Sequence, residues 1–467
     1  MTGLLAMSLL IVLAALAFLM LVAYRGYSVI LFAPVAALGA VLLTDPSLVP
    51  PMFSSVFMDK MVGFIKSYFP VFMLGAVFGK VIELSGFSKS IVSAVIGVLG
   101  RERAILSIVV VCSILTYGGV SLFVVVFAVY PFAAEMFRQS DIPKRLIPCT
   151  IALGAFTYTM DSLPGSPQIQ NIIPTTFFKT TTWAAPWLGI IGAAFILALG
   201  LLYINTRRRA AQAKGEGYGT NLVNEPEPYE AETLPNPWIA LAPLVIVGAA
   251  NFIFTHFIPK AYGTTHEITV GAKPIVTQIS TVAAIWAVEG ALLLGILTVF
   301  AFAWRPVLAK FAEGSKAAVG GALLASMNTA AEYGFGGVIA LLPGFTVIAD
   351  ALRAIPNPLI NEAISVTVLA GITGSASGGM SIALAAMSDT FIAAAEQANI
   401  PLEVLHRVAS MASGGMDTLP HNGAVITLLA VTGLTHKDSY KDIFVITCIK
   451  TAAVFVAIAV FYLTGIY

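Results

Sequence analysis

Apolar runs recur along the whole chain, and their lengths match the thickness of a lipid bilayer. A helix that crosses the hydrocarbon core needs about 20 consecutive apolar residues. Uninterrupted runs near this length occur at 4–24, 28–43, 62–84, 184–204, 237–257, 279–303, 317–342 and 442–466. The pattern predicts an all-α polytopic membrane protein whose main surroundings are the lipid bilayer.

Four further apolar stretches are interrupted by glycine, proline and polar residues. We interpret 104–137 and 359–395 as re-entrant hairpins, each entering and leaving on one side of the membrane. We interpret 145–178 and 403–435 as discontinuous helices. The interruptions are Tyr117-Gly118-Gly119, Asp161-Ser162-Leu163-Pro164-Gly165, the segment 374–379 and the segment 417–423.

A single long polar segment, 205–236, divides the chain. It is rich in Glu, Pro and Gly and has no apolar periodicity, which is typical of a flexible linker. The segment separates two halves of the chain, 1–204 and 237–467. Each half is expected to contain one hairpin and one discontinuous helix.

Short sequences in the first half return in the same order in the second half, at offsets between 256 and 260 positions. Such an ordered series predicts an internal repeat. The paired segments are Met160-Asp161-Ser162-Leu163-Pro164 with Met416-Asp417-Thr418-Leu419-Pro420, Gly118-Gly119-Val120-Ser121-Leu122 with Gly378-Gly379-Met380-Ser381-Ile382, Ile142-Pro143 with Ile400-Pro401, and Gly86-Phe87 with Gly344-Phe345.

The halves are predicted to have inverted topologies. If each contains five crossings and one hairpin, the odd number of crossings turns the second half over. With this arrangement most of the 25 Lys and Arg residues fall on one side, including Arg101, Arg103, Arg138 and the run 207–209. The basic side is cytoplasmic. We therefore expect a bacterial inner-membrane protein with a cytoplasmic 205–236 segment and both termini outside.

Composition narrows the possible functions. The chain is 58% hydrophobic and 10% charged, whereas soluble domains carry about 25% charged residues. Its net charge of +1 gives no reason to expect a nucleic-acid partner. Cys112, Cys149 and Cys448 are far apart in apolar runs, a spacing that fits neither a disulfide framework nor a zinc site. We expect no metal and no cofactor.

Discontinuous helices at matching positions of inverted halves point to a transporter's binding site. Glycine lets backbone N–H groups approach a ligand, and the N-termini of half-helices favour anions. The alternative is that small residues only let helices pack closely. The candidate substrate-binding residues are Tyr117, Gly118, Gly119, Ser121, Asn171, Ser375, Ser377, Gly378, Gly379, Ser381 and Asn422.

Four ionisable residues are candidates for carrying a coupling proton or binding a coupling cation: Asp161, Asp417, His421 and Glu332. An ionisable side chain at membrane depth is costly unless it is paired or functional. The two aspartates could instead cap the half-helices that follow them. His421 could titrate near physiological pH or serve as a hydrogen-bond donor of fixed charge.

At these interruptions the chain resembles the gluconate:proton symporter (GntP) family within the ion-transporter superfamily. The likeness rests on 74–80 with its Gly79-Lys80 pair, on 162–167, on Gly374-Ser375-Ala376 and on His421-Asn422-Gly423. Gly118-Gly119 stand where the gluconate branch carries a glutamate. The opening 23–29 and the first hairpin are more similar to the D-3-hydroxybutyrate permease branch. The superfamily implies a homodimer with scaffold and transport domains and elevator-type movement.

The sequence thus favours proton-coupled symport of a small hydroxy-monocarboxylate such as 3-hydroxybutyrate. Sodium coupling is the nearest alternative, because carboxylates, carbonyls and hydroxyls also bind hard cations. A gluconate-like sugar acid or a dicarboxylate is an alternative substrate. No arginine lies in any interruption to form a bidentate pair with a second carboxylate, which disfavours a dianion. A passive channel and an intramembrane aspartyl enzyme remain as alternatives of other classes. Asp161 and Asp417 are tied to Pro breaks, which disfavours the enzyme.

Overall fold

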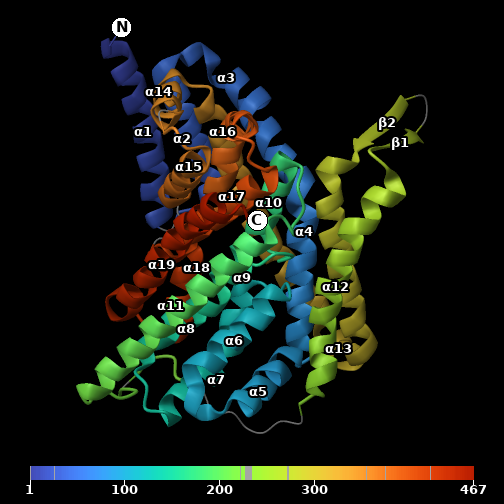
Figure 1. Ribbon diagram of the computed structural model, residues 1–467, viewed down its shortest axis with the longest axis vertical. Helices are drawn as coiled ribbons and strands as arrows, with labels where there is room; N and C mark the ends of the chain where they lie inside the picture. Colours follow the sequence, from blue (N-terminus) through green and yellow to red (C-terminus); the bar gives the residue numbers. More distant parts are fainter. Residues whose placement is uncertain are drawn as a thin grey trace.

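The computed structural model describes residues 2–467 except 26, 221, 227–233, 271–272, 354, 374 and 421. Helices make up most of it, which confirms the all-α polytopic class (Figure 1). In the described part of the chain, six helical segments are long and apolar enough to cross a membrane: Pro46–Leu84, Pro186–Ala213, Pro237–Tyr262, Ile279–Ala340, Ala376–Gln397 and His436–Thr464.

The first half runs from α1 to α11. Helix α4 is continuous with the short elements before it, so that one helical segment spans 46–84. The elements are α1 (Thr2–Tyr24), α2 (Val29–Thr44), α3 (Val49–Met52), the π-helical η2 (Phe53–Phe57), α4 (Met58–Leu84), α5 (Phe87–Leu99), α6 (Ala104–Tyr117), α7 (Leu122–Gln139), α8 (Ile147–Ala155), α9 (Tyr158–Asp161), α10 (Ile169–Phe178) and α11 (Pro186–Ala213), with 3-10 turns η1 (Pro46–Leu48), η3 (Arg101–Arg103) and η4 (Lys144–Leu146).

The second half begins with α12 and contains the described strands of the chain, an antiparallel hairpin that projects from the helical body (Figure 1). This hairpin was not predicted, because two six-residue strands leave little mark on the apolar pattern. The elements are α12 (Pro237–Tyr262), β1 (Thr265–Val270), β2 (Lys273–Gln278), α13 (Ile279–Ala340), α14 (Pro343–Arg353), α15 (Pro358–Thr373), α16 (Ala376–Gln397), α17 (Leu402–Gly414), the 3-10 helix η5 (Gly415–Thr418), α18 (Gly423–Thr432) and α19 (His436–Thr464).

Helix α13 is formally 62 residues long, but it folds back on itself at Ala303. This residue has non-helical angles, φ −134° and ψ 37°. The rings of Phe300 and Phe311 are 5.2 Å apart, whereas eleven residues of straight helix would separate them by roughly 16 Å along the axis. The element is therefore two antiparallel helices, in agreement with the separate apolar runs 279–303 and 317–342.

Polar residues at the helix starts fix several of the element boundaries. Ser375 accepts a hydrogen bond from Gly378 N–H at 3.0 Å and caps α16, and Asn422 accepts from Ala424 N–H at 2.7 Å and caps α18. Thr435 and Asp438 form a capping box at the start of α19. Side-chain caps thus define the starts of α16, α18 and α19.

The same order of elements occurs in both halves. Three helices, counting the two arms of α13 separately, are followed by a short amphipathic helix, a helical hairpin, an interrupted helix and a long final helix. The short amphipathic helices are α5 and α14. In Figure 1, α5 and α7 lie toward the lower end of the molecule, whereas α14 and α16 lie toward the upper end.

The 205–236 segment is more ordered than the sequence suggested. Residues 205–213 continue α11. Beyond it, Glu216 pairs with Arg145 at 2.6 Å, and Glu225 pairs with the buried Lys144 at 2.7 Å. Apolar periodicity does not reveal such pairing, because it depends on charges from another part of the chain. These ion pairs hold the segment against the first half.

Candidate functional site at the helix interruptions

Each interrupted element has a short non-helical connection, and we name the four connections here. The first tip is 118–121, between α6 and α7, and the first break is 162–168, between α9 and α10. The second tip is 374–375, between α15 and α16, and the second break is 419–422, between η5 and α18. Gly374 and His421, both assigned above from the sequence, lie outside the described residues.

The first tip is fastened to the first break. The hydroxyl of Tyr117 donates to the Pro164 carbonyl at 2.8 Å, and the Gln168 side-chain amide donates to the Thr116 carbonyl at 2.7 Å. Ser121 stands at the N-cap position of α7, where its side chain makes no capping hydrogen bond, and is half-buried. The phenol of Tyr117 is therefore committed to the protein.

The two glycines of the first tip are explained by packing. A Cβ on Gly118 would come 2.5 Å from Leu244 of α12, and Gly119 has a left-handed φ of +96°. A side chain on either residue would clash or strain the backbone. The packing alternative therefore accounts for these two positions without a ligand.

The second break and the second tip share one carboxylate. Asp417 accepts from the side-chain amide of Gln170 at 2.8 Å and from the backbone N–H of Ala376 at 3.3 Å. Gln170 belongs to α10, directly after the first break, and Ala376 is the first residue of α16. Asp417 thus joins three of the four interruptions, and it caps α16 instead of the half-helix that follows it.

A second carboxylate, Glu332 of α13, lies against the start of α16. A Cβ on Gly378 would overlap its Oε2 atom, so this glycine is what allows the approach. Glu332 shares a hydrogen bond with Ser375, and Thr329, one turn earlier, lies 3.4 Å from the Ser377 hydroxyl. The sequence assignment of Glu332 is thereby connected to the serine-rich second tip.

Buried polar atoms without a hydrogen-bond partner collect around these connections. Such atoms are uncommon in folded proteins, and each calls for an explanation. Within the described residues they include Thr116 Oγ1 beside the first tip, Asp161 Oδ2 and Gln170 Oε1 beside the first break, and Glu332 Oε2 and Ser381 Oγ near the second tip. A polar ligand or water would satisfy hydrogen-bonding capacity of this kind.

Asn171 is held inside a buried network. Its amide donates to the carbonyls of Ser166 and Thr182, both at 2.9 Å. Its oxygen lies within hydrogen-bond distance of His406 and Arg407, at 3.2 and 3.0 Å. Both amide protons and the oxygen are therefore engaged, and the side chain positions α10 against α17. The oxygen of Asn422 is likewise engaged, as the cap of α18.

An arginine does reach an interruption, contrary to the sequence expectation. Arg407 of α17 is fully buried, and it donates to the Asp161 carbonyl at 2.9 Å and to the Ala184 carbonyl at 2.7 and 3.2 Å. With the bond to Asn171, four of its five N–H groups are in use. It therefore cross-links backbone and is not available as a bidentate clamp. Sequence spacing could not reveal this, since Arg407 lies ten residues before Asp417.

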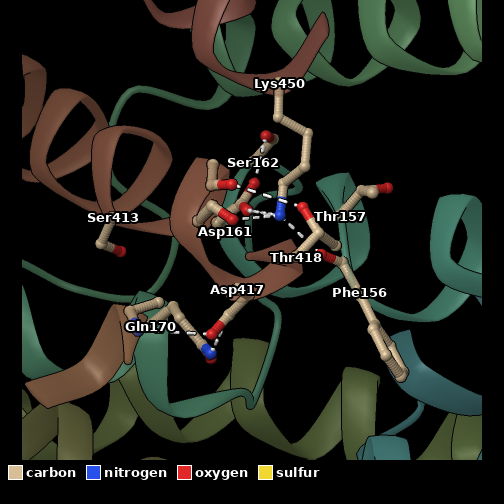
Figure 2. Close-up of polar contacts among 12 residues, drawn as sticks. Phe156, Thr157, Asp161, Ser162, Gln170, Ser413, Asp417, Thr418 and Lys450 are labelled. Atoms are coloured by element: carbon tan, nitrogen blue, oxygen red, sulfur yellow. Dashed lines mark hydrogen bonds and ion pairs between the residues drawn. The ribbon is translucent and has the colours of Figure 1, made fainter. Parts of the chain in front are cut away.

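Lys450 of α19 is a further buried charged residue, which the sequence pattern alone did not single out. Its ammonium lies 3.6 Å from Asp161 Oδ2 and donates to the carbonyls of Phe156 and Gly414 (Figure 2). The Ser162 hydroxyl donates to the other oxygen of Asp161 at 2.6 Å. Asp161 and Asp417, which occupy the same place in two similar sequence motifs, thus have different partners.

Among the described residues, no group of three or more His, Cys, Asp or Glu side chains is arranged to hold a metal ion. Cys112, Cys149 and Cys448 are free thiols.

Comparison with known proteins gives one close relative. The chain is 60% identical over 471 residues to the uncharacterized transporter YxjC of Bacillus subtilis, covering 98% of this chain and all of the relative. No family model matches the sequence. Among solved structures, the YdaH transporter of Alcanivorax borkumensis, whose topology is described as unusual, aligns with a TM-score of 0.48 and 14% identity. That alignment covers 91% of this chain and 90% of the YdaH chain.

Proposed function

The chain belongs to the family of the Bacillus subtilis transporter YxjC and is therefore a membrane transporter, not an enzyme, and we propose that it is a proton-coupled symporter of a small hydroxy-monocarboxylate such as 3-hydroxybutyrate. The observation that carries this proposal is the concentration of unpartnered buried polar atoms around the helix interruptions. The same atoms would bind a polar solute at membrane depth.

The substrate carboxylate binds at the second tip. The start of α16 presents the Ser377 hydroxyl, and Ser381 one turn further on has a buried, unpartnered hydroxyl. A helix N-terminus favours an anion. Arg407 already donates four hydrogen bonds to protein oxygens, so it cannot also form a bidentate pair with a substrate carboxylate. This supports a monoanion over a dicarboxylate.

Glu332 links the substrate to the proton. When protonated, its carboxyl group donates a hydrogen bond to the substrate carboxylate; when ionised, it repels the same group. Substrate binding at the second tip therefore requires a proton on Glu332. Asp161, Asp417 and His421 are the further candidates for the coupling step.

The movement that carries the site across the membrane is elevator-type, in a homodimer of inverted repeats. The matching order of elements and the placement of α5 and α14 toward opposite ends support the inversion. The 205–236 segment is cytoplasmic and both termini are outside. Arg138, Lys144, Arg145 and Arg207 pair with this segment or with Asp442 beside it, and such basic clustering is typical of a cytoplasmic face.

The resemblance to the gluconate:proton symporter family and its D-3-hydroxybutyrate permease branch supports the choice of 3-hydroxybutyrate as the first substrate to test. Gluconate or another sugar acid is the alternative substrate. Sodium is the alternative coupling ion, because carboxylate and carbonyl oxygens line the first break.

The test is counterflow of labelled 3-hydroxybutyrate in proteoliposomes that contain the purified full-length protein. We expect saturable exchange that excess unlabelled 3-hydroxybutyrate abolishes and that gluconate and succinate leave intact. An inward proton gradient should drive accumulation equally well when choline replaces Na⁺. Absence of counterflow would reject the substrate, and accumulation that needs Na⁺ would reject proton coupling.

A further inference from the structure

The ammonium of Lys450 is surrounded by oxygen atoms from three other elements. Its Nζ donates to the Phe156 carbonyl at 2.5 Å and to the Gly414 carbonyl, and it lies 3.6 Å from Oδ2 of Asp161 (Figure 2). The Lys450 side chain is 1% exposed. This environment of two carbonyls and one carboxylate is the kind that proteins offer to a hard cation.

The two carbonyls come from equivalent places in the repeat. Phe156 follows the last residue of α8, Gly414 is the last residue of α17, and the two are 258 positions apart. The C-terminal end of a half-helix has unpaired carbonyls and the negative end of the helix dipole. Cations in inverted-repeat transporters bind at such ends. The position equivalent to Lys450 in α11 is Gly192, so only one lysine enters the shared space.

Charge balance around the ammonium is close to neutral. Asp161 from α9 and Asp417 from η5 face Lys450, and Arg407 from α17 lies within electrostatic reach of Asp161. Two positive and two negative groups thus share this part of the protein. Without the Lys450 side chain, the two half-helix ends would lack the positive charge that holds them together.

A simple ion pair does not describe the contact. The oxygen of Asp161 that faces Lys450 makes no hydrogen bond, and the closer contacts of the ammonium are the backbone carbonyls. Lysine pairs that only neutralise a buried carboxylate are expected to donate to it directly. The arrangement is that of a cation held by half-helix ends, with the carboxylate as its counter-charge.

We propose that the Lys450 ammonium fills a built-in cation site, so that its positive charge takes the place of a bound sodium ion. The proposal rests on the proposed proton-coupled transport. The site is closed to free cations as long as the ammonium occupies it.

The experiment removes the ammonium and asks whether a free cation takes its place. Thermal unfolding of the purified full-length protein is followed in NaCl and in choline chloride at equal ionic strength, for the wild type, Lys450→Ala, Lys450→Ala with Asp161→Asn, and Lys441→Ala. Lys441 is an exposed lysine of the same helix and serves as the matched control. No transport substrate is needed.

We expect Na⁺ to raise the unfolding temperature of Lys450→Ala by about 2 °C or more. The wild type, the Lys441→Ala control and the double variant should unfold at the same temperature in both salts. Equal stability of Lys450→Ala in both salts would overturn the proposal. A sodium response of the wild type would overturn it as well.

A second variant keeps the proposal testable if Lys450→Ala does not fold. Lys450→Gln carries no charge, and its side-chain oxygen can join the two carbonyls as a ligand of a sodium ion. Na⁺ should therefore raise its unfolding temperature as well. Equal stability of this variant in both salts would overturn the proposal. Failure of wild-type counterflow would reject the proposed function alone, because the sodium response is measured without substrate.

Discussion

Gln170 and Asp417 are 247 positions apart in the chain, and the side-chain amide of Gln170 donates to the Asp417 carboxylate at 2.8 Å. The other oxygen of that carboxylate accepts from the backbone N–H of Ala376. One aspartate therefore connects the two interrupted helices with the second tip. Its counterpart in the repeat, Asp161, has no such role and faces Lys450 instead. Two similar sequence motifs thus make different contacts.

The Asp417 contact predicts that Asp417→Asn disconnects the two interrupted helices. The variant has one acceptor oxygen instead of two, and it lacks the negative charge that strengthens both contacts of Asp417. We expect at least a ten-fold loss of 3-hydroxybutyrate counterflow, with the protein still present in the membrane at normal level. Asp389→Asn, at an exposed position of α16, is the control and should transport normally. Normal counterflow in Asp417→Asn would show that this connection is dispensable.

The close approach of Glu332 to α16 predicts that Gly378→Ala abolishes transport. The added methyl group would overlap the Glu332 carboxylate and come 3.0 Å from the Ser375 hydroxyl. Gly320→Ala is the matched control in α13, because a Cβ there meets nothing within 4 Å. The control should stabilise its helix by about 1 kcal/mol. Uptake by the two variants is compared at equal expression. Normal uptake by Gly378→Ala would show that the close approach of Glu332 to α16 is not required for transport.

Arg407 is predicted to stabilise the fold without taking part in coupling. Replacing it by methionine leaves the carbonyls of Asp161 and Ala184 buried without their donors, and we expect a loss of about 3–5 kcal/mol. The loss should be seen as a lower unfolding temperature in detergent, with and without substrate. A variant of normal stability that fails only in transport would place Arg407 in the binding machinery instead.

The cytoplasmic network predicts acid sensitivity of the 205–236 segment. Burial raises the pKa of Glu225, but hydrogen bonds from Lys144 and Arg138 outweigh it and hold the pKa below the ordinary value of 4.5. A carboxylate with a lowered pKa contributes stability above its unfolded pKa and loses that contribution as the pH falls through the folded value. We expect protection from hydrogen exchange at 214–220 and 222–226 to persist to pH 4.5 and to fall below it.

The matched variant for this network is Glu225→Gln. It removes the negative charge between Lys144 and Arg138 and should reduce protection of the same residues already at neutral pH. Glu102→Gln, at an exposed position in η3, should leave protection unchanged. Equal protection of wild type and Glu225→Gln at every pH would mean that the segment is held by other contacts.

Much of the fold was predictable from the sequence, because the bilayer imposes a length and a composition on every span. The apolar runs 279–303 and 317–342 correspond to the two arms of α13, even though the helix is formally continuous at Ala303. The interruptions were predictable because Gly, Pro and polar residues are costly at membrane depth. The ion pairs of Glu216 and Glu225 were not predictable, because they depend on which surfaces meet in the folded protein.

The candidate site was only partly predictable for the same reason. Asp161, Asp417 and Glu332 stand out as acids in apolar surroundings, and all three lie at the interruptions. The partners that decide their roles are distant in sequence: Lys450 for Asp161, Gln170 for Asp417 and Gly378 for Glu332. Asn171 was expected to face the substrate, but its side chain is occupied within the protein.

The central claim, that a proton enters together with a hydroxy-monocarboxylate, is tested most directly by the pH inside proteoliposomes. A trapped pH-sensitive dye is followed while 3-hydroxybutyrate is added outside in sodium-free buffer, with the wild type and Glu332→Gln measured side by side. The account predicts rapid internal acidification with the wild type and none with Glu332→Gln, which should still exchange labelled substrate. Uptake of labelled 3-hydroxybutyrate by the wild type without internal acidification would contradict it.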